Sequence, residues 1–74
     1  MSSNLCSGVG NKLAWPELVG EQVSVAVATI HRENSYVQPV VIPEGIPLIS
    51  LEYRCDRVRV WVEGSIVSRV PYVG

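Results

Sequence analysis

Two arginines, Arg57 and Arg59, stand at alternate positions in a run that otherwise holds valine and tryptophan. Alternation with a period of two is typical of a strand, so both guanidinium groups lie on one face, pointing away from the core. A guanidinium group carries rigid N–H donors that suit carboxylate, hydroxyl and carbonyl acceptors. The preceding residues supply such acceptors in the Ser50 hydroxyl, the Glu52 carboxylate and the backbone carbonyls. This pattern predicts an adjacent loop that is braced by hydrogen bonds from Arg57 and Arg59.

The loop to be braced covers about residues 44–54 and is apolar near its centre, where Leu48, Ile49 and Leu51 occur. It contains no run of turn formers, so it cannot close a tight hairpin. An exposed apolar tip is unfavourable in water unless another molecule covers it. A loop that is extended in advance also loses less conformational entropy on binding. These features indicate a loop that lies in the cleft of a protease as an extended substrate does.

Enzymatic chemistry is poorly represented in the chain. His31 is the single histidine, and a catalytic triad would need a serine and an acid held beside it in a pocket. A metal site built on this histidine and the two cysteines lacks a fourth strong ligand and the CxxC spacing. The chain is therefore not expected to be an enzyme, and no metal or other cofactor is expected. The residues considered for a triad are Ser24, Ser35, His31, Glu33 and Asp56.

Three blocks stand out along the chain: WPELVG at residues 15–20, SLEYRCDRVRVWV at residues 50–62 and VPYVG at residues 70–74. In this order they resemble the potato inhibitor I family of serine protease inhibitors. The family's reactive-site pattern is Thr, a variable specificity residue, Asp or Glu, an apolar residue, Arg, two variable positions and Arg-Val-Arg. The second block follows this pattern with Ser50 in the place of Thr. The resemblance covers nearly the whole chain.

In this family the residue after the conserved Thr enters the primary specificity pocket of the protease, and the scissile bond follows it. Because the Leu51 side chain is branched, aliphatic and uncharged, it suits the apolar pockets of chymotrypsin-like and subtilisin-like proteases. These proteases are the partners that the resemblance implies. It also implies a reactive bond between Leu51 and Glu52, flanking contacts from Ile49, Ser50 and Tyr53, and loop support from Arg54, Arg57 and Arg59.

The loop carries one residue more than the family pattern between its glycine and the reactive site. If the extra residue is absorbed near Ile46 and Pro47, Leu51 keeps the specificity position. If it is absorbed after Pro47, Ser50 takes that position instead. We favour Leu51 because its spacing to Glu52 and to the two strand arginines fits the pattern. The rival interpretation is a binding or storage module that keeps the scaffold without inhibitory strength.

The 74 residues form a single domain, in which residues 1–14 are an N-terminal arm expected to be poorly ordered except at Cys6. A chain this short buries only about 60% of its unfolded surface, so a staple is expected. Cys6 and Cys55 can supply a bridge worth about 4 kcal/mol at most, whereas the alternative is two free, buried thiols. Family members with cysteines at the matching places join them. The resemblance thus implies the disulfide and, with it, an extracellular or vacuolar location.

The elements that must position these residues follow from periodicity. Residues 15–20 predict a buried anchor, Trp15 and Leu18, on a short turn opened by Pro16. Residues 23–34 fit two periods, because the valines alternate as in a strand while the apolar residues also share one helical face. We predict a helix, since a length of about twelve residues is ordinary for a helix and long for a strand. Its N-terminal cap is weak.

Strands are predicted over residues 37–42 and 57–62, with a tight turn at residues 63–65 and a last antiparallel strand over residues 66–70. The long loop between the first two strands lets them run parallel. The predicted fold class is α+β: one helix packed on a small twisted sheet, with a parallel strand pair, an antiparallel C-terminal strand and a long exposed reactive-site loop.

The charge and hydropathy of the chain exclude several kinds of partner. The net charge is −1 with the charges interspersed, so nothing attracts the protein to nucleic acid or anionic lipid. No stretch approaches the roughly eighteen apolar residues of a membrane span. Residues 1–10 lack the basic and apolar regions of a signal peptide. We therefore expect neither nucleic acid nor a membrane as partner, and nothing requires more than a monomer.

Overall fold

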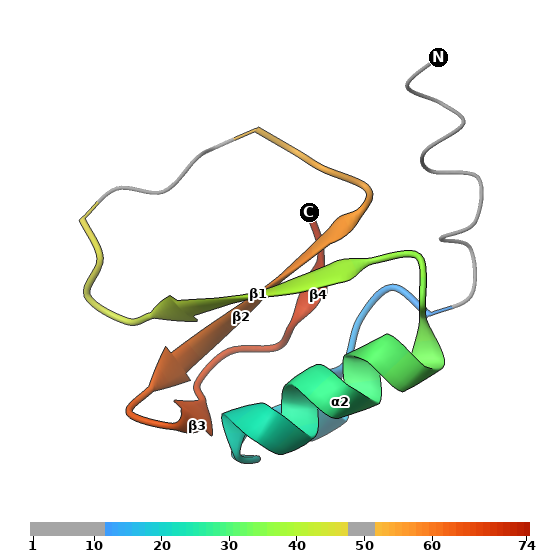
Figure 1. The fold of residues 1–74 in the computed structure, drawn as a ribbon. Coiled ribbons are helices and arrows are strands. Elements are labelled where there is room, and N and C mark those ends of the chain that lie inside the picture. The colour runs from blue at the N-terminus through green and yellow to red at the C-terminus, as the bar shows by residue number, and fades with distance from the viewer. Residues whose placement is uncertain (1–11, 48–51) are drawn as a thin grey trace.

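The computed structural model describes residues 12–47 and 52–74, which form one helix packed against a four-stranded sheet (Figure 1). The predicted helix, parallel strand pair and antiparallel C-terminal strand are confirmed. Within the described part of the chain, no helix has the length and apolar character needed to cross a bilayer. The elements follow in the order η1 (Pro16–Leu18), α2 (Val23–Glu33), β1 (Gln38–Pro43), β2 (Arg57–Glu63), β3 (Ile66–Val67) and β4 (Tyr72–Val73).

Strand β2 is the centre of the sheet because every other strand pairs with it. β1 runs parallel to it, with Gln38 opposite Arg57 and Pro43 opposite Val62. On the other edge, β4 pairs with the start of β2 and β3 with its end, both antiparallel. Two neighbouring parallel strands need a long connection, and residues 44–56 supply it. The loop is therefore the crossover between two paired strands, which fixes both of its ends.

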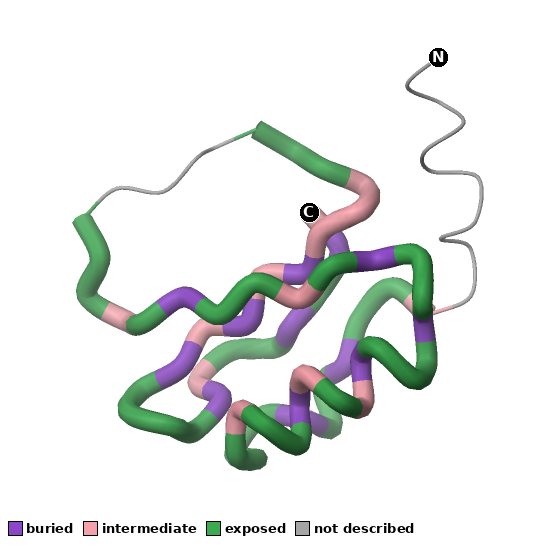
Figure 2. Tube along the Cα trace, in the orientation of Figure 1, coloured by how far each residue is buried: buried purple, intermediate pink, exposed green. Residues whose placement is uncertain are grey.

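The burial of β2 alternates along the strand, as its sequence predicts. One face carries buried valines, whereas the other carries Arg57, Arg59 and Trp61, which are only half-buried; we call this second face the outer face. The valine face belongs to the core that helix α2 covers, and Figure 2 marks the buried positions along both elements. The core consists of Trp15, Leu18, Ala26, Ile30, Val37, Val58, Val60, Val62, Val67 and Val73.

The start of helix α2 is stabilised by the neighbouring hairpin. Gln22 occupies the N-cap position and makes no side-chain cap bond, in agreement with the weak cap predicted. The Val23 N–H donates instead to the Ser65 carbonyl at 2.8 Å. The turn that presents this carbonyl has Gly64 at φ +65°, which is typical of the first central residue of a type II′ turn. The hairpin thus returns the chain and also satisfies one of the free N–H groups of the helix.

The last strand differs from its prediction. The sequence predicts one antiparallel strand over residues 66–70, whereas β3 ends at Val67 and β4 begins at Tyr72, with one further backbone bond to β2 from the Ser68 N–H to the Trp61 carbonyl at 2.9 Å. One cause is that Pro71 has no N–H for a ladder, and at the break the side chains of Ser68 and Arg69 bind Glu44. The C-terminal segment therefore pairs with both ends of β2, through β3 and β4. β4 is a separate strand that the periodicity of the sequence did not predict.

The end of the N-terminal arm is also better ordered than its composition predicts. The expectation of poor order up to residue 14 is wrong for residues 12–14, although Cys6 itself lies outside the described residues. The Leu13 carbonyl accepts a hydrogen bond from the Val73 N–H at 2.9 Å, and the next residue forms a β-bridge with the same strand. Pairing with β4 orders this segment because it satisfies backbone groups that the local sequence could not.

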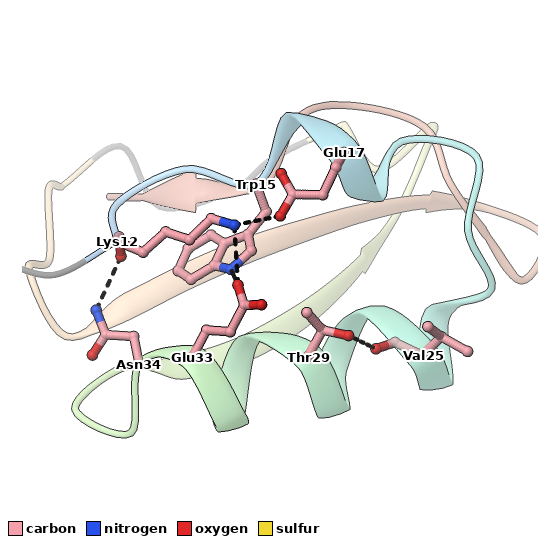
Figure 3. A network of polar contacts seen from close by, with 7 residues as sticks. All are labelled: Lys12, Trp15, Glu17, Val25, Thr29, Glu33 and Asn34. Atoms are coloured by element: carbon pink, nitrogen blue, oxygen red, sulfur yellow. Dashed lines mark hydrogen bonds and ion pairs between the residues drawn. The ribbon is translucent and has the colours of Figure 1, made fainter.

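A polar cluster around Trp15 joins this segment to the end of the helix (Figure 3). Lys12 Nζ hydrogen-bonds the Glu17 carboxylate and lies 3.0 Å from Glu33 Oε1. Trp15 is fully buried, as predicted, and donates from its indole N–H to the same Glu33 oxygen at 2.9 Å. The buried Asn34 donates from its amide to the Lys12 carbonyl at 3.1 Å. The cluster therefore fixes the tryptophan and the helix end on which the core depends.

Removing the Lys12 charge is expected to reduce stability more at neutral than at acidic pH. Its hydrogen bonds hold the pKa values of Glu17 and Glu33 below the ordinary 4.5. The stability that these carboxylates contribute is therefore complete above that value and is lost as the pH falls through the lowered pKa values. The hydrogen bond to Glu17, and after it the one to Glu33, raises the pKa of Lys12 above its ordinary 10.5. The stability that the Lys12 cation contributes is therefore lost only in strong alkali.

We expect Lys12→Met to lower the midpoint of urea unfolding at about pH 7 and to approach the native protein at about pH 3. Arg32→Met, at an exposed position in the last turn of α2, is the matched control because it removes a cation of similar length. Its difference from the native protein should vary little over the same range. An equal loss for Lys12→Met at both pH values would contradict the assigned ion pairs.

Candidate functional site

The candidate site is the loop between β1 and β2. We call residues 44–47 its first arm and residues 52–56 its second arm. In Figure 1 both arms extend from the sheet on the side opposite helix α2, and the C-terminal end of the chain lies beneath them. The loop is thus presented on the outer face, away from the hydrophobic core.

The structure describes only some of the predicted contact residues. Ile49, Ser50 and Leu51 lie outside the described residues, so their roles stay predictions. Glu52 and Tyr53 begin the second arm and are exposed. The Tyr53 residue has an exposed fraction of 71%, which leaves most of its ring available to a partner.

Arg57 holds the second arm from below. Its Nε donates to the main-chain oxygen of Gly74 at 2.9 Å, and its Nη2 donates to the Glu52 carbonyl at 2.7 Å. The sequence predicted the Ser50 hydroxyl, the Glu52 carboxylate and the backbone carbonyls as acceptors, and these two bonds from Arg57 go to backbone oxygens. A backbone carbonyl is already fixed by the chain, so binding it freezes no further side-chain rotamer. Arg57 thereby fixes the main chain at the residue that follows Leu51.

Gly74 is a site residue that the sequence reasoning missed. Its N–H donates to the Arg57 carbonyl at 2.8 Å, and its main-chain oxygen accepts a bond from the Arg54 N–H at 3.3 Å. A side chain at this position would contact the rings of Tyr72 and Tyr53, at 3.6 and 3.8 Å. The VPYVG block indicated that this segment matters. Its contacts could be found only once β4 was placed beside β2.

Arg54 supports the second arm through a local pair. Its Nε and Nη2 donate to the two carboxylate oxygens of Asp56, each at 3.0 Å. The hydrogen bond from Arg54 is the main reason that the pKa of Asp56 lies below its ordinary value. Cys55, between them, is half-buried against the hydrophobic core. Its predicted partner Cys6 lies outside the described residues, so the disulfide stays a prediction.

The outer face forms a pocket of about 330 Å³ beneath the second arm. Arg59 lines this pocket from the same face of β2 as Arg57. The Arg69 guanidinium lies over the Trp61 ring, 4.1 Å from its centroid, and lines the pocket as well. Cationic and aromatic side chains therefore bound the space between loop and sheet. An apolar lining would instead be expected to bring the loop down onto the strands.

Comparison with known proteins identifies the chain's family. The potato inhibitor I family matches residues 7–74. A relative from Momordica charantia, named Glu S.griseus protease inhibitor, is 47% identical over 70 residues, which cover 93% of this chain and 97% of the relative. The inhibitor of trypsin and hageman factor from Cucurbita maxima is 45% identical over 64 residues, covering 84% and 93%.

A solved structure agrees with the sequence matches. The crystal structure of bitter gourd trypsin inhibitor is similar with a TM-score of 0.85 at 45% identity, covering 92% of this chain and 100% of that one. The predicted fold and family are therefore confirmed, and the relatives are named as inhibitors of proteases rather than as enzymes. The chain belongs to the potato inhibitor I family of protease inhibitors.

Proposed function

We propose that this protein inhibits chymotrypsin-like and subtilisin-like serine proteases by presenting its loop as a substrate, with the reactive bond between Leu51 and Glu52. The two relatives described above are named for different proteases, so membership of the family does not select a target. The proposal for these targets rests on Leu51, because an uncharged, branched side chain suits a deep apolar pocket and offers no cation to a trypsin-like one.

The pair of bonds from Arg57 is the observation that carries the inhibitory mechanism. Hydrolysis of the reactive bond would leave a carboxyl group on Leu51 and an amino group on Glu52. Because Arg57 binds the Glu52 carbonyl and Gly74, the new amino end would stay close to its original place. The reverse reaction, in which the two ends condense and release water, then competes with dissociation. Slow net cleavage is the expected result.

Three further features complete the proposal. Tyr53 would contact the protease on the far side of the bond, since its ring is largely exposed. A disulfide between Cys6 and Cys55 would tie the second arm to the N-terminal arm, and the half-buried position of Cys55 beside the core supports this pairing. The protein would act as a monomer, with one protease for each loop.

Incubation with chymotrypsin, subtilisin and trypsin, followed by mass analysis of the products, tests the proposal. We expect tight inhibition of the first two enzymes, weak inhibition of trypsin and slow cleavage after Leu51. Cleavage after Ser50 would show that the extra loop residue displaces Leu51 from the specificity position. Rapid cleavage without inhibition, or no interaction with any of the three enzymes, would favour a non-inhibitory binding or storage module.

A further inference from the structure

Glu44, the first residue of the first arm, accepts three side-chain hydrogen bonds. Arg69 donates to both carboxylate oxygens, from Nε at 2.8 Å and from Nη2 at 2.9 Å. The Ser68 hydroxyl donates to one of the same oxygens at 2.7 Å. Two parallel bonds from one guanidinium to one carboxylate fix their relative orientation as well as their distance. The start of the loop is thereby attached to the segment between β3 and β4.

Arg69 is itself held on the sheet by Trp61. The guanidinium lies 4.1 Å from the centroid of the indole ring, which is within the range of cation–π attraction. Trp61 belongs to the outer face of β2 and pairs in register with Ile42 of β1. The cation therefore rests on the central strand of the sheet, and part of its rotamer freedom is already lost before it binds Glu44.

The two arms of the loop are thus attached by different cations. Arg57 binds the second arm, which follows the proposed reactive bond, whereas Arg69 binds the first arm, which precedes it. Just beyond Glu44 the chain leaves the sheet at Gly45, whose φ of +92° lies in the left-handed region. Glu44 therefore lies at the point where the first arm departs, held there by a bond from its N–H to the Val62 carbonyl at 2.8 Å as well as by Arg69.

We propose that Arg69, seated on Trp61, is a positioning residue that holds the first arm through Glu44, so that both ends of a cut reactive bond stay in place. The inference rests on the proposed function and extends it. Contacts to the second arm retain the new amino end only. Religation also requires the new carboxyl end at attacking distance, and a fixed first arm reduces the volume that this end can explore.

The exposure of the Arg69–Glu44 ion pair predicts which measurement its loss will change most. The side chains of Arg69 and Glu44 are 56% and 26% exposed, and partly exposed ion pairs contribute little to global stability. A loop that must be ordered in advance depends on such a contact more strongly, because each lost attachment raises the entropic cost of binding. We therefore expect inhibition to suffer more than the unfolding temperature.

The test is a double-mutant cycle of Glu44→Ala and Arg69→Ala, read out by the inhibition constant for chymotrypsin and by the equilibrium ratio of intact to cleaved inhibitor. We expect each single substitution to weaken inhibition by roughly three- to tenfold and to shift the ratio toward the cleaved form by a similar factor. The double substitution should be no worse than either single one, because both remove the same contact.

A milder variant and a control distinguish the loss of this contact from a general loss of folded structure. Arg69→Lys keeps the cation over Trp61 but loses the two parallel bonds, so it should give an intermediate effect. Glu63→Ala removes an exposed glutamate at the end of β2 and should leave both readouts unchanged. Unchanged readouts in Glu44→Ala and Arg69→Ala, or fully additive effects, would overturn the positioning role. If the native protein fails to inhibit, the proposed function itself is overturned, a result that needs no variant.

Discussion

Arg57→Ala is expected to weaken inhibition of chymotrypsin by about ten- to a hundredfold and to accelerate net cleavage after Leu51. The substitution removes the bonds to Glu52 and Gly74, and a hydrogen bond involving a charged group contributes about 1.5–3 kcal/mol. We take the value of a single bond, since the contact to Glu52 is exposed, and each 1.4 kcal/mol changes an affinity about tenfold. Inhibition assays and mass analysis of the cleaved form would measure the two effects.

Arg57→Lys and Arg32→Ala serve as the matched comparisons for this prediction. A lysine keeps the charge but cannot span two acceptors in different directions, so inhibition should fall between that of the native protein and Arg57→Ala. Arg32 lies in the last turn of α2, on the opposite side of the sheet from the loop (Figure 1), and its removal should change neither assay. A variant Arg57→Ala that still inhibits at full strength and is cleaved no faster would refute the bracing role.

Leu51→Lys is expected to exchange the target of the inhibitor. Placing an ammonium group in an apolar specificity pocket costs several kcal/mol, so inhibition of chymotrypsin should fall by about a hundredfold or more. A pocket that carries an acid at its base would gain an ion pair in return, so inhibition of trypsin should rise by about the same factor. Inhibition constants against the two enzymes, measured side by side, give the result.

The same substitution at the neighbouring position decides between the two registers of the loop. Ser50→Lys should weaken inhibition of chymotrypsin without creating strong inhibition of trypsin if Leu51 is the specificity residue. The opposite pattern, a trypsin inhibitor from Ser50→Lys and none from Leu51→Lys, would place the extra loop residue after Pro47. Both variants place the same cation at neighbouring loop positions, so each is a control for the other.

Local patterns in the sequence were sufficient to predict the elements in which buried residues recur at a regular spacing. Helix α2 was predicted from the shared face of residues such as Ala26 and Ile30, and both are buried. The alternation of β2 separated Val58 and Val60 from the arginines, and the structure has the same alternation. In both elements the period of the backbone and the period of the apolar residues agree, so the local signal is strong.

Contacts between distant segments could not be read in this way. At the break in the last strand, two side chains bind Glu44, which lies about twenty-five residues earlier in the chain. The order at Leu13 depends on Val73 at the other end of the sequence. One acceptor for Arg57 is Gly74, whose position is known only when β4 lies beside β2. None of these pairings leaves a periodic signal, because each partner is specified by the tertiary fold.

The alternation of β2 also makes inhibition a direct assay of correct folding. A slip of this strand by a single position would turn the valines to water and the arginines into the hydrocarbon interior. Such a mispaired chain would lack both the core and the attachment of the loop, so it could not retain partial activity. After refolding from denaturant, the amount of protease titrated by a preparation should therefore equal the fraction of molecules whose strands have found their native alignment.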